Sequence, residues 1–203
     1  DLFVEEVRVS NRGPEIILSR TADEILSKVF YLEIPEISNG LVDLKAVARE
    51  AGSRSKVAVA ANSDNVDPIG SCVGQRGSRI QTIINEVGGE KIDIIEYSDD
   101  PSKFIANALA PAKIEQVNLN YENKQATVTV DPEQLSLAIG RDGQNVRLAA
   151  RLTGWHLDII STTDKTNEIP AQEASKKEKS KKAKTTTEKK VKKQTSKTTA
   201  KKT

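Results

Sequence analysis

The sequence predicts an α+β protein built mainly from two copies of one small module, each in the order helix, strand, strand, helix, helix, strand. Three observations predict this fold class. The chain repeats itself at an offset of 66 residues, each copy carries a Gly-x-x-Gly loop between two apolar helical segments, and each copy ends in a β-branched run. A chain of 203 residues with 36% hydrophobic residues also suits small modules better than one large fold.

The internal repeat relates Gly74–Ile95 to Gly140–Ile160. It matches the two glycines of each loop, apolar residues at helical spacing, and a glycine after each helix. The matched pairs are Gly74 with Gly140, Gly77 with Gly143, Ile80 with Val146, Ile84 with Ala150, and Gly88 with Gly154. Apolar spacing of three and four residues predicts a helix after each loop. The closing glycine and the β-branched run after it predict a helix end followed by a strand.

The remaining elements follow the same order in both modules. A proline at the start of a short apolar segment is typical of a helix N-terminus, and alternating residues around a turn predict a hairpin. In the first module, helices are expected at Ala22–Tyr31 and Asp67–Val73, and a hairpin is expected from Leu41–Arg49 and Lys56–Ala61. In the second module, helices are expected at Ser102–Leu109 and Glu133–Ile139, and a hairpin from Ile114–Tyr121 and Gln125–Val130. Val42, Leu44, Ala46 and Ala48 are expected on one face of the first hairpin.

The two ends of the chain differ from the modules. Leu2–Val9 predicts a strand, whereas the chain after Thr162 has no apolar periodicity and predicts a disordered tail rich in Lys. From Glu173 onward there are 13 Lys and 3 Glu, net +10, which leaves residues 1–172 with net −8. An anionic ligand of the folded part must therefore be bound by local geometry and a few placed cations.

Composition excludes several kinds of site. Cys72 is the only cysteine and His156 the only histidine, so neither an internal disulfide nor a zinc site of Cys and His is possible. We expect Cys72 to be a small buried hydrophobe. The sequence has no G-x-x-x-x-G-K-[ST] loop, no apolar span of about 20 residues and no signal peptide. We therefore expect a cytoplasmic protein that is not an enzyme and needs no metal or cofactor, with a hydrolase working through carboxylates alone as the alternative.

A Gly-x-x-Gly loop between two helices has a direct chemical use. Two glycines let the backbone turn sharply and approach a ligand closely. The second helix then presents unpaired N–H groups and the positive end of its dipole, which suits a phosphate.

These features resemble the KH module, whose Gly-x-x-Gly loop clamps about four nucleotides of single-stranded nucleic acid. The order of elements is similar to the bacterial (type II) KH arrangement. Three strings resemble the tandem KH region of the NusA family of bacterial transcription elongation, termination and antitermination factors: REAGSRSKVAV (Arg49–Val59), DPIGSCVGQRGSRIQTIINEVGGEKIDII (Asp67–Ile95) and LAIGRDGQNVRLAARLTGWHLDI (Leu137–Ile159). PEIILSRT (Pro14–Thr21) resembles the last strand of the OB-fold domain that precedes the KH pair in that family.

The resemblance implies four regions. Residues 1–20 would be the C-terminal end of an OB-fold domain, 21–98 the first KH domain, 99–162 the second KH domain, and 163–203 a disordered Lys-rich tail.

The resemblance also implies the RNA contacts. They fall on the two loops and on the helix starts after them: Gly74, Gln75, Arg76, Gly77, Ser78 and Arg79, then Gly140, Arg141, Asp142, Gly143, Gln144, Asn145 and Arg147. The arginines can meet phosphates or stack on bases, and Gln144 and Asn145 can hydrogen-bond base edges.

Two sets of residues qualify this assignment. Asp142 places a carboxylate where phosphate is expected, so the first loop is expected to be the better clamp. The hairpin cations Arg49, Arg54 and Lys56 either extend the RNA path or form a solvated hairpin face.

The function implied by the resemblance is binding of nascent single-stranded RNA, which modulates pausing, termination and antitermination by RNA polymerase. Polymerase contacts are expected outside this chain, in a preceding N-terminal part, and other elongation factors or ribosomal proteins are further partners. We expect a monomer with no membrane partner. The alternative is a KH adaptor that acts on ribosomal or decaying RNA outside transcription.

Overall fold

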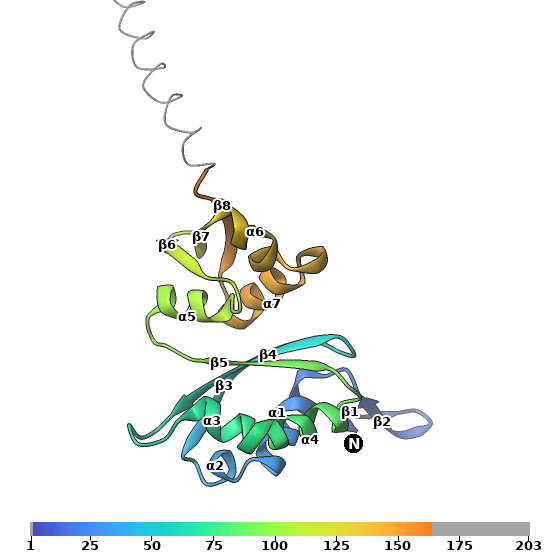
Figure 1. Ribbon diagram of the computed structural model, residues 1–203. Helices are drawn as coiled ribbons and strands as arrows, with labels where there is room; N and C mark the ends of the chain where they lie inside the picture. Colours follow the sequence, from blue (N-terminus) through green and yellow to red (C-terminus); the bar gives the residue numbers. More distant parts are fainter. Residues whose placement is uncertain (1, 164–203) are drawn as a thin grey trace, which may run out of the picture. The chain divides into compact units, whose positions relative to one another are not determined.

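The computed structural model describes residues 2–163 (Figure 1), and one compact unit extends to Ser161. It opens with an antiparallel hairpin of β1 (Phe3–Ser10) and β2 (Gly13–Ser19). Both strands were predicted to within two residues at each end. The expected tail lies outside the described residues except for Thr163.

The first module contains all six predicted elements and one short helix that was not predicted. Each element whose limits were predicted lies within two residues of those limits. They are α1 (Asp23–Glu33), the additional α2 (Pro35–Ser38), β3 (Val42–Glu50), β4 (Arg54–Ala61), α3 (Pro68–Val73), α4 (Ser78–Glu86) and β5 (Lys91–Glu96).

The second module repeats this order without the additional helix. Its elements are α5 (Pro101–Ala108), β6 (Ile114–Asn120), β7 (Gln125–Val130), α6 (Pro132–Ile139), α7 (Gln144–Thr153) and β8 (His156–Ser161). Each module has a three-stranded sheet in the order β3-β4-β5 or β6-β7-β8, with an antiparallel first pair and a parallel second pair. The predicted α+β fold of two tandem modules is confirmed.

Three helices begin with the same Asp-Pro pair. Asp67, Asp100 and Asp131 are the N-cap residues of α3, α5 and α6, and each carboxylate accepts a hydrogen bond from the backbone N–H two residues later, at 2.9–3.1 Å. The proline that follows has the φ of a first helical residue and needs no hydrogen-bond acceptor. This local chemistry explains why the predicted helix starts are accurate.

The face prediction for the first hairpin is wrong, and a bulge is the reason. The pairing of β3 with β4 shifts between Leu44 and Ala46, so the side chains beyond Lys45 change sides. Val42 and Leu44 pack in the first module's core beneath α1, whereas Ala46 and Ala48 pack in the cluster of the second module.

This second cluster joins the two modules. Ala48, Ala58 and Ile95 of the first sheet are buried with Leu109 and Leu148 of the second module, and α7 lies against β3 and β4. Helices α1, α3 and α4 lie on the other side of that sheet (Figure 1). Alanine side chains let a helix approach a sheet closely, so the sheet of the first module is covered on both faces. No helix in residues 2–163 is both long and apolar enough to span a bilayer.

Candidate nucleic-acid interface

The two Gly-x-x-Gly loops have the same backbone conformation. Each is a short 3₁₀ turn, η1 (Gln75–Gly77) or η2 (Arg141–Gly143), whose last two residues are left-handed. The φ angles of Gly74, Arg76 and Gly77 are 73°, 53° and 78°, and those of Gly140, Asp142 and Gly143 are 76°, 52° and 72°. The repeat found in the sequence is therefore also a repeat of backbone geometry.

The first glycine of each loop is required by close approach as well as by its positive φ. A Cβ atom on Gly74 would lie 2.7 Å from Cγ of Arg79. On Gly140 it would lie 2.8 Å from both Cβ and the backbone nitrogen of Asn145. Both distances are shorter than a van der Waals contact. A side chain at either position would therefore push the loop away from the helix that follows it.

The second glycine of each loop leaves the following helix open to an anion. Gly77 and Gly143 are the N-cap residues of α4 and α7, and neither helix start has a side-chain cap. The N–H of the first helical residue, Ser78 or Gln144, donates back to the carbonyl oxygen of Gln75 or Arg141 within the loop. Since no side chain caps either helix, the positive end of each helix dipole faces a ligand, which favours an anion.

The third loop position differs in charge between the modules but not in conformation. Arg76 and Asp142 are both exposed and left-handed. Aspartate adopts this conformation more readily than most residues, which gives Asp142 a backbone role that its charge did not suggest. Within residues 2–163, Arg76 and Arg141 have no ion-pair partner, so both guanidinium groups are open to a ligand.

Two predicted RNA contacts, Arg79 and Asn145, support the loops through hydrogen bonds within the protein. Arg79 donates to the backbone oxygen of Ser71 at 2.7 Å and pairs with Glu36 at 2.8 Å. Asn145 is 7% exposed, and its side-chain nitrogen donates to backbone oxygens at the ends of two helices: Leu109, Ala138 and Leu137, at 3.0, 3.1 and 3.4 Å. Arg79 and Asn145 occupy the same position of the repeat, and so do Ser71 and Leu137. A base-edge contact by Asn145 would compete with these hydrogen bonds and stays a prediction.

Two other predicted contacts, Gln144 and Arg147, reach across to the first module. The side-chain nitrogen of Gln144 donates to Glu50 at 2.7 Å and to Oγ of Ser53 at 2.9 Å. Nε of Arg147 lies 2.6 Å from Glu50 Oε1. Hydrogen bonds from Arg147 and Gln144 hold the pKa of Glu50 below its ordinary value, although partial burial acts to raise it. The repeat aligns each module only with its counterpart, so no pattern in the sequence indicates this contact.

Each loop borders a cavity. The cavity at the first loop has a volume of about 660 Å³, and the one at the second loop has a volume of about 500 Å³. The first is lined by Glu36, Asn65, Val66, Asp67, Gly70, Ser71, Gly74, Gln75, Ser78 and Arg79. The second is lined by Glu50, Ser53, Arg54, Lys91, Gly140, Arg141, Asp142, Gln144, Asn145 and Arg147. Residues of the first module thus contribute to the cavity of the second loop, which sequence reasoning missed.

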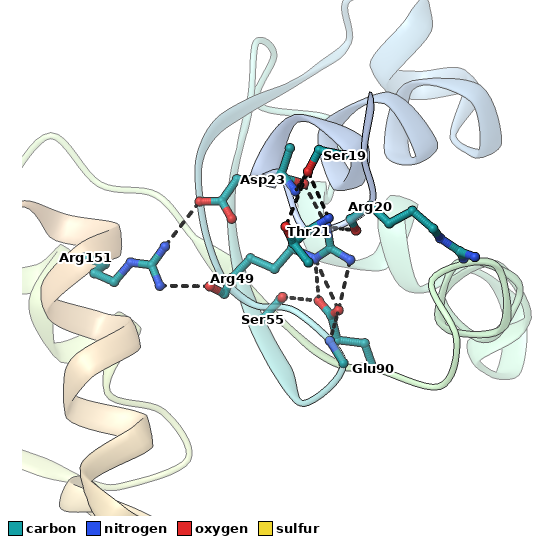
Figure 2. A network of polar contacts seen from close by, with 10 residues as sticks. Ser19, Arg20, Thr21, Asp23, Arg49, Ser55, Glu90 and Arg151 are labelled. Atoms are coloured by element: carbon teal, nitrogen blue, oxygen red, sulfur yellow. Dashed lines mark hydrogen bonds and ion pairs between the residues drawn. The ribbon is translucent and has the colours of Figure 1, made fainter. Parts of the chain in front are cut away.

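For Arg49, both sequence interpretations are wrong, because its guanidinium is buried. It forms an ion pair with Glu90, Nε to Oε1, at 3.0 Å (Figure 2). It also donates to the backbone oxygens of Ala22 at 2.7 Å and Arg20 at 3.2 Å. Its own carbonyl accepts from Arg151 of α7 at 2.8 Å. Arg49 therefore joins four segments of the chain and is closed to RNA.

The other two hairpin cations are also held by the fold. Lys56 is fully buried, and its ammonium donates to the backbone oxygen of Ala110 at 3.0 Å and lies 3.4 Å from Asp93. Burial lowers the pKa of Lys56, opposed by the neighbouring Asp93 carboxylate. Arg54 makes two hydrogen bonds to Asp93, at 2.8 and 2.9 Å. Neither a solvated face nor an RNA path describes Lys56.

Cys72 is buried in the first module's core, as predicted, and burial raises the pKa of its thiol to about 11. The thiolate form is therefore disfavoured at neutral pH. Within the part of the chain that the structure describes, no three His, Cys, Asp or Glu residues are grouped as a metal site would need.

Family models agree with the two modules. Residues 20–97 match the NusA-like first KH domain, and residues 101–167 match the NusA-like second KH domain. A crystal structure of APE1850 has a TM-score of 0.50 at 24% identity and covers 68% of this chain and 96% of that chain. That likeness concerns the fold alone.

Relatives with the printed name transcription termination/antitermination protein NusA are similar over most of this chain. The protein of Halalkalibacterium halodurans is 54% identical over 162 residues, which are 80% of this chain and 42% of that protein. The Bacillus subtilis protein is 53% identical over 163 residues, 80% of this chain and 44% of the relative. The Thermus thermophilus protein is 49% identical over 156 residues, 77% of this chain and 40% of the relative.

The chain thus spans less than half the length of these relatives. Their similarity falls on the segment with the duplicated loops, and both modules match NusA-type models in the same order. From its two tandem KH domains and from these relatives, the chain belongs to the NusA family.

Proposed function

We propose that this chain is the RNA-binding part of a bacterial transcription elongation factor, and that its two Gly-x-x-Gly loops bind nascent single-stranded RNA. The observation that carries this proposal is the duplicated loop geometry. In both loops, two left-handed residues precede a helix start without a side-chain cap. RNA binding is the activity that KH domains imply.

Each loop offers RNA a set of backbone donors and an exposed arginine. A phosphate at the start of α4 or α7 would lie at the positive end of the helix dipole, near N–H groups that no side chain caps. Arg76 and Arg141 flank these donors and, within the described residues, have no ion-pair partner. We assign the predicted contacts Gln75, Arg76, Ser78 and Arg141 to direct binding, and Arg79 and Asn145 to support of the loops.

The names of the relatives support a role in transcription over the alternative of an adaptor for ribosomal or decaying RNA. In the proposed mechanism, the paired KH domains hold RNA that emerges from RNA polymerase. This contact changes hairpin folding and pausing, and thereby termination and antitermination. No bond is made or broken by the protein. We further propose that residues 1–20 end an OB-fold domain, that the KH domains occupy 21–98 and 99–162, and that the protein acts as a monomer in the cytoplasm.

An RNA titration tests the binding proposal. Fluorescence anisotropy of a labelled single-stranded RNA at fixed salt would be measured for the whole chain, for residues 1–163, and for the Gln75→Asp/Arg76→Asp variant. We expect the loop variant to lose more affinity than the truncation loses. Asp142 already has the conformation of Arg76 in the second loop, so aspartate at position 76 should not disturb the backbone.

The exposed Lys103→Asp, on α5, is the control outside the loops and has the same change of charge as the Arg76→Asp part of the loop variant. If the truncation is the costlier change, the loops are not the main RNA site. A second assay measures the pause lifetime of RNA polymerase on a hairpin-dependent pause, with this chain joined to the polymerase-contacting part that is expected to precede it. The loop variant should lose the effect that the unmodified protein has on the pause.

A further inference from the structure

The cavity beside the second loop is built by both KH domains. Its second-domain wall is the loop and the start of α7, and its first-domain wall is the end of the β3–β4 hairpin together with the start of β5. Its volume of about 500 Å³ lies in the range of small-ligand sites. We propose that this cavity is a composite nucleotide subsite in which Lys91 binds an RNA phosphate while Glu50 opposes binding by holding Arg147. The proposal rests on the proposed function and deepens it.

Lys91 is the first-domain cation of this cavity that is open to a phosphate. Arg54 also lines the cavity, but its guanidinium is committed to Asp93 through two hydrogen bonds. Lys91 is exposed and has no ion-pair partner within residues 2–163. Its backbone N–H donates to the oxygen of Ser53 at 3.1 Å, which fixes the start of β5 beside the hairpin turn. The lysine therefore extends from a fixed backbone while its ammonium remains available.

Glu50 binds one cation and one amide beside the second loop that could otherwise contact RNA. Its two oxygens accept from Arg147 at 2.6 Å and from Gln144 at 2.7 Å. A phosphate that binds Arg147 must replace this carboxylate and is also repelled by it. The first domain thus supplies one group that attracts RNA and one that competes with it.

The exposure of the Glu50–Arg147 pair makes replacement feasible. The Arg147 side chain is 52% exposed and that of Glu50 22%, so water and salt weaken their attraction. The buried Arg49–Glu90 pair has side chains that are only 4% and 0% exposed. The first pair can open for a ligand, whereas the second cannot open without disturbing the core.

One face of α7 holds the two walls of the cavity in fixed positions relative to each other. Gln144, Arg147 and Arg151 are spaced by three and four residues on α7, and all three contact the first domain. At the far end of this row, Arg151 bonds the Arg49 carbonyl and lies 3.4 Å from Asp23 (Figure 2). The shared alanine-rich core beneath them fixes the distance between the two walls.

Single-stranded RNA binding across a salt series tests this subsite. The probes are Lys91→Gln, Glu50→Gln and Arg147→Gln, each also made in the Gln75→Asp/Arg76→Asp background so that the second loop dominates binding. Lys91→Gln should weaken binding several-fold and reduce the slope of log affinity against log salt by about 0.7, the loss of one phosphate contact. Glu50→Gln should strengthen binding and steepen the slope by a similar amount, because the neutral amide holds Arg147 less strongly than the carboxylate does and does not repel a phosphate.

The combination of variants separates competition from positioning. If Glu50 competes with RNA, Arg147→Gln costs more affinity in the Glu50→Gln background than in the unmodified chain. If Glu50 positions Arg147 for RNA, Glu50→Gln weakens binding, and the proposed opposition is overturned. Glutamine can still accept hydrogen bonds from Arg147, so the variant should keep the fold.

Matched controls are Lys103→Gln and Glu122→Gln, which change the same charges at exposed positions outside the cavity. An unchanged affinity and salt slope for Lys91→Gln would overturn the composite subsite while leaving RNA binding by the loops intact. Failure of the unmodified chain to bind RNA would instead overturn the proposed function.

Discussion

The Arg49 guanidinium and the Glu90 carboxylate form a buried ion pair whose remaining hydrogen-bonding groups are satisfied by the fold. Glu90 accepts from Arg49 at 3.0 Å, from the Gly52 N–H at 2.9 Å and from the Ser55 hydroxyl. Arg49 donates onward to the backbone before α1. Such a pair adds little net stability compared with apolar residues, but it is costly to break from one side.

Glu90→Gln is therefore expected to destabilise the chain by about 3–5 kcal/mol, because it leaves the Arg49 charge buried without a counter-charge. Urea unfolding followed by circular dichroism measures this difference. Glu122→Gln, at an exposed turn, is the control and should change the free energy of unfolding by less than about 0.5 kcal/mol. A Glu90→Gln variant as stable as the control would mean that the pair is dispensable.

The same pair predicts a pH dependence. Burial acts to raise the pKa of Glu90, but the hydrogen bonds from Arg49, Ser55 and Gly52 outweigh it and hold the pKa below the ordinary value of 4.5. A carboxylate with a lowered pKa stabilises the fold above its unfolded-state pKa, and this stabilisation is lost as pH falls through the folded-state value. The stability difference between the unmodified chain and Glu90→Gln should thus be constant near neutral pH and shrink below about pH 4.5. A constant difference down to the acid transition would contradict this linkage.

Alanine at the first glycine of each loop should have unequal effects. Gly74 and Gly140 have φ of 73° and 76° with ψ of 175°, a region that is open essentially to glycine alone, so both substitutions are strained by roughly 1–3 kcal/mol. At Gly74 the new Cβ meets the flexible Arg79 side chain, which can shift, whereas at Gly140 it meets the backbone nitrogen of Asn145. We expect Gly140→Ala to lower the melting temperature more than Gly74→Ala in differential scanning calorimetry. The reverse order would show that the Arg79 side chain is the more rigid obstacle.

Asn145→Ala tests whether this residue supports the loop. It would leave backbone oxygens at the ends of α5 and α6 without their side-chain donor, at a cost of about 1–3 kcal/mol. Thermal unfolding measures the loss. RNA affinity of the first loop should stay unchanged at a temperature where the variant is folded. A variant of full stability with weakened RNA binding would instead make Asn145 a base-reading residue.

Asp142→Asn should tighten RNA binding. Asparagine also adopts the left-handed conformation at this position, so the loop geometry is kept while a negative charge is removed beside the proposed phosphate site. Affinity for single-stranded RNA at fixed salt measures the change. Asp64→Asn, an exposed carboxylate in the loop after β4, is the charge-matched control and should have little effect. Unchanged or weaker binding by Asp142→Asn would mean that the carboxylate does not oppose RNA.

Much of the fold could be predicted because its signals are local. The signals are the loop glycines, the Asp-Pro pairs, and the helical spacing of apolar residues that begins at Ile80 in one module and at Val146 in the other. Each acts through the neighbouring backbone, and each occurs in both modules. The short helix α2 was missed because its four residues contain too few apolar positions to set a period.

What the sequence alone determined is therefore the repeated module and the placement of its two loops. The tertiary structure decided which side chains those loops can use. Arg49 and Lys56 look like surface cations in the sequence, but partners 41 and 54 residues away hold them in buried positions. Glu50 contacts Arg147, which lies 97 residues away in the sequence, and one bulge at Lys45 turns Ala46 and Ala48 toward the second domain. Local spacing cannot encode such contacts, because they depend on how segments that are distant in the sequence pack together, within the first module and between the two modules.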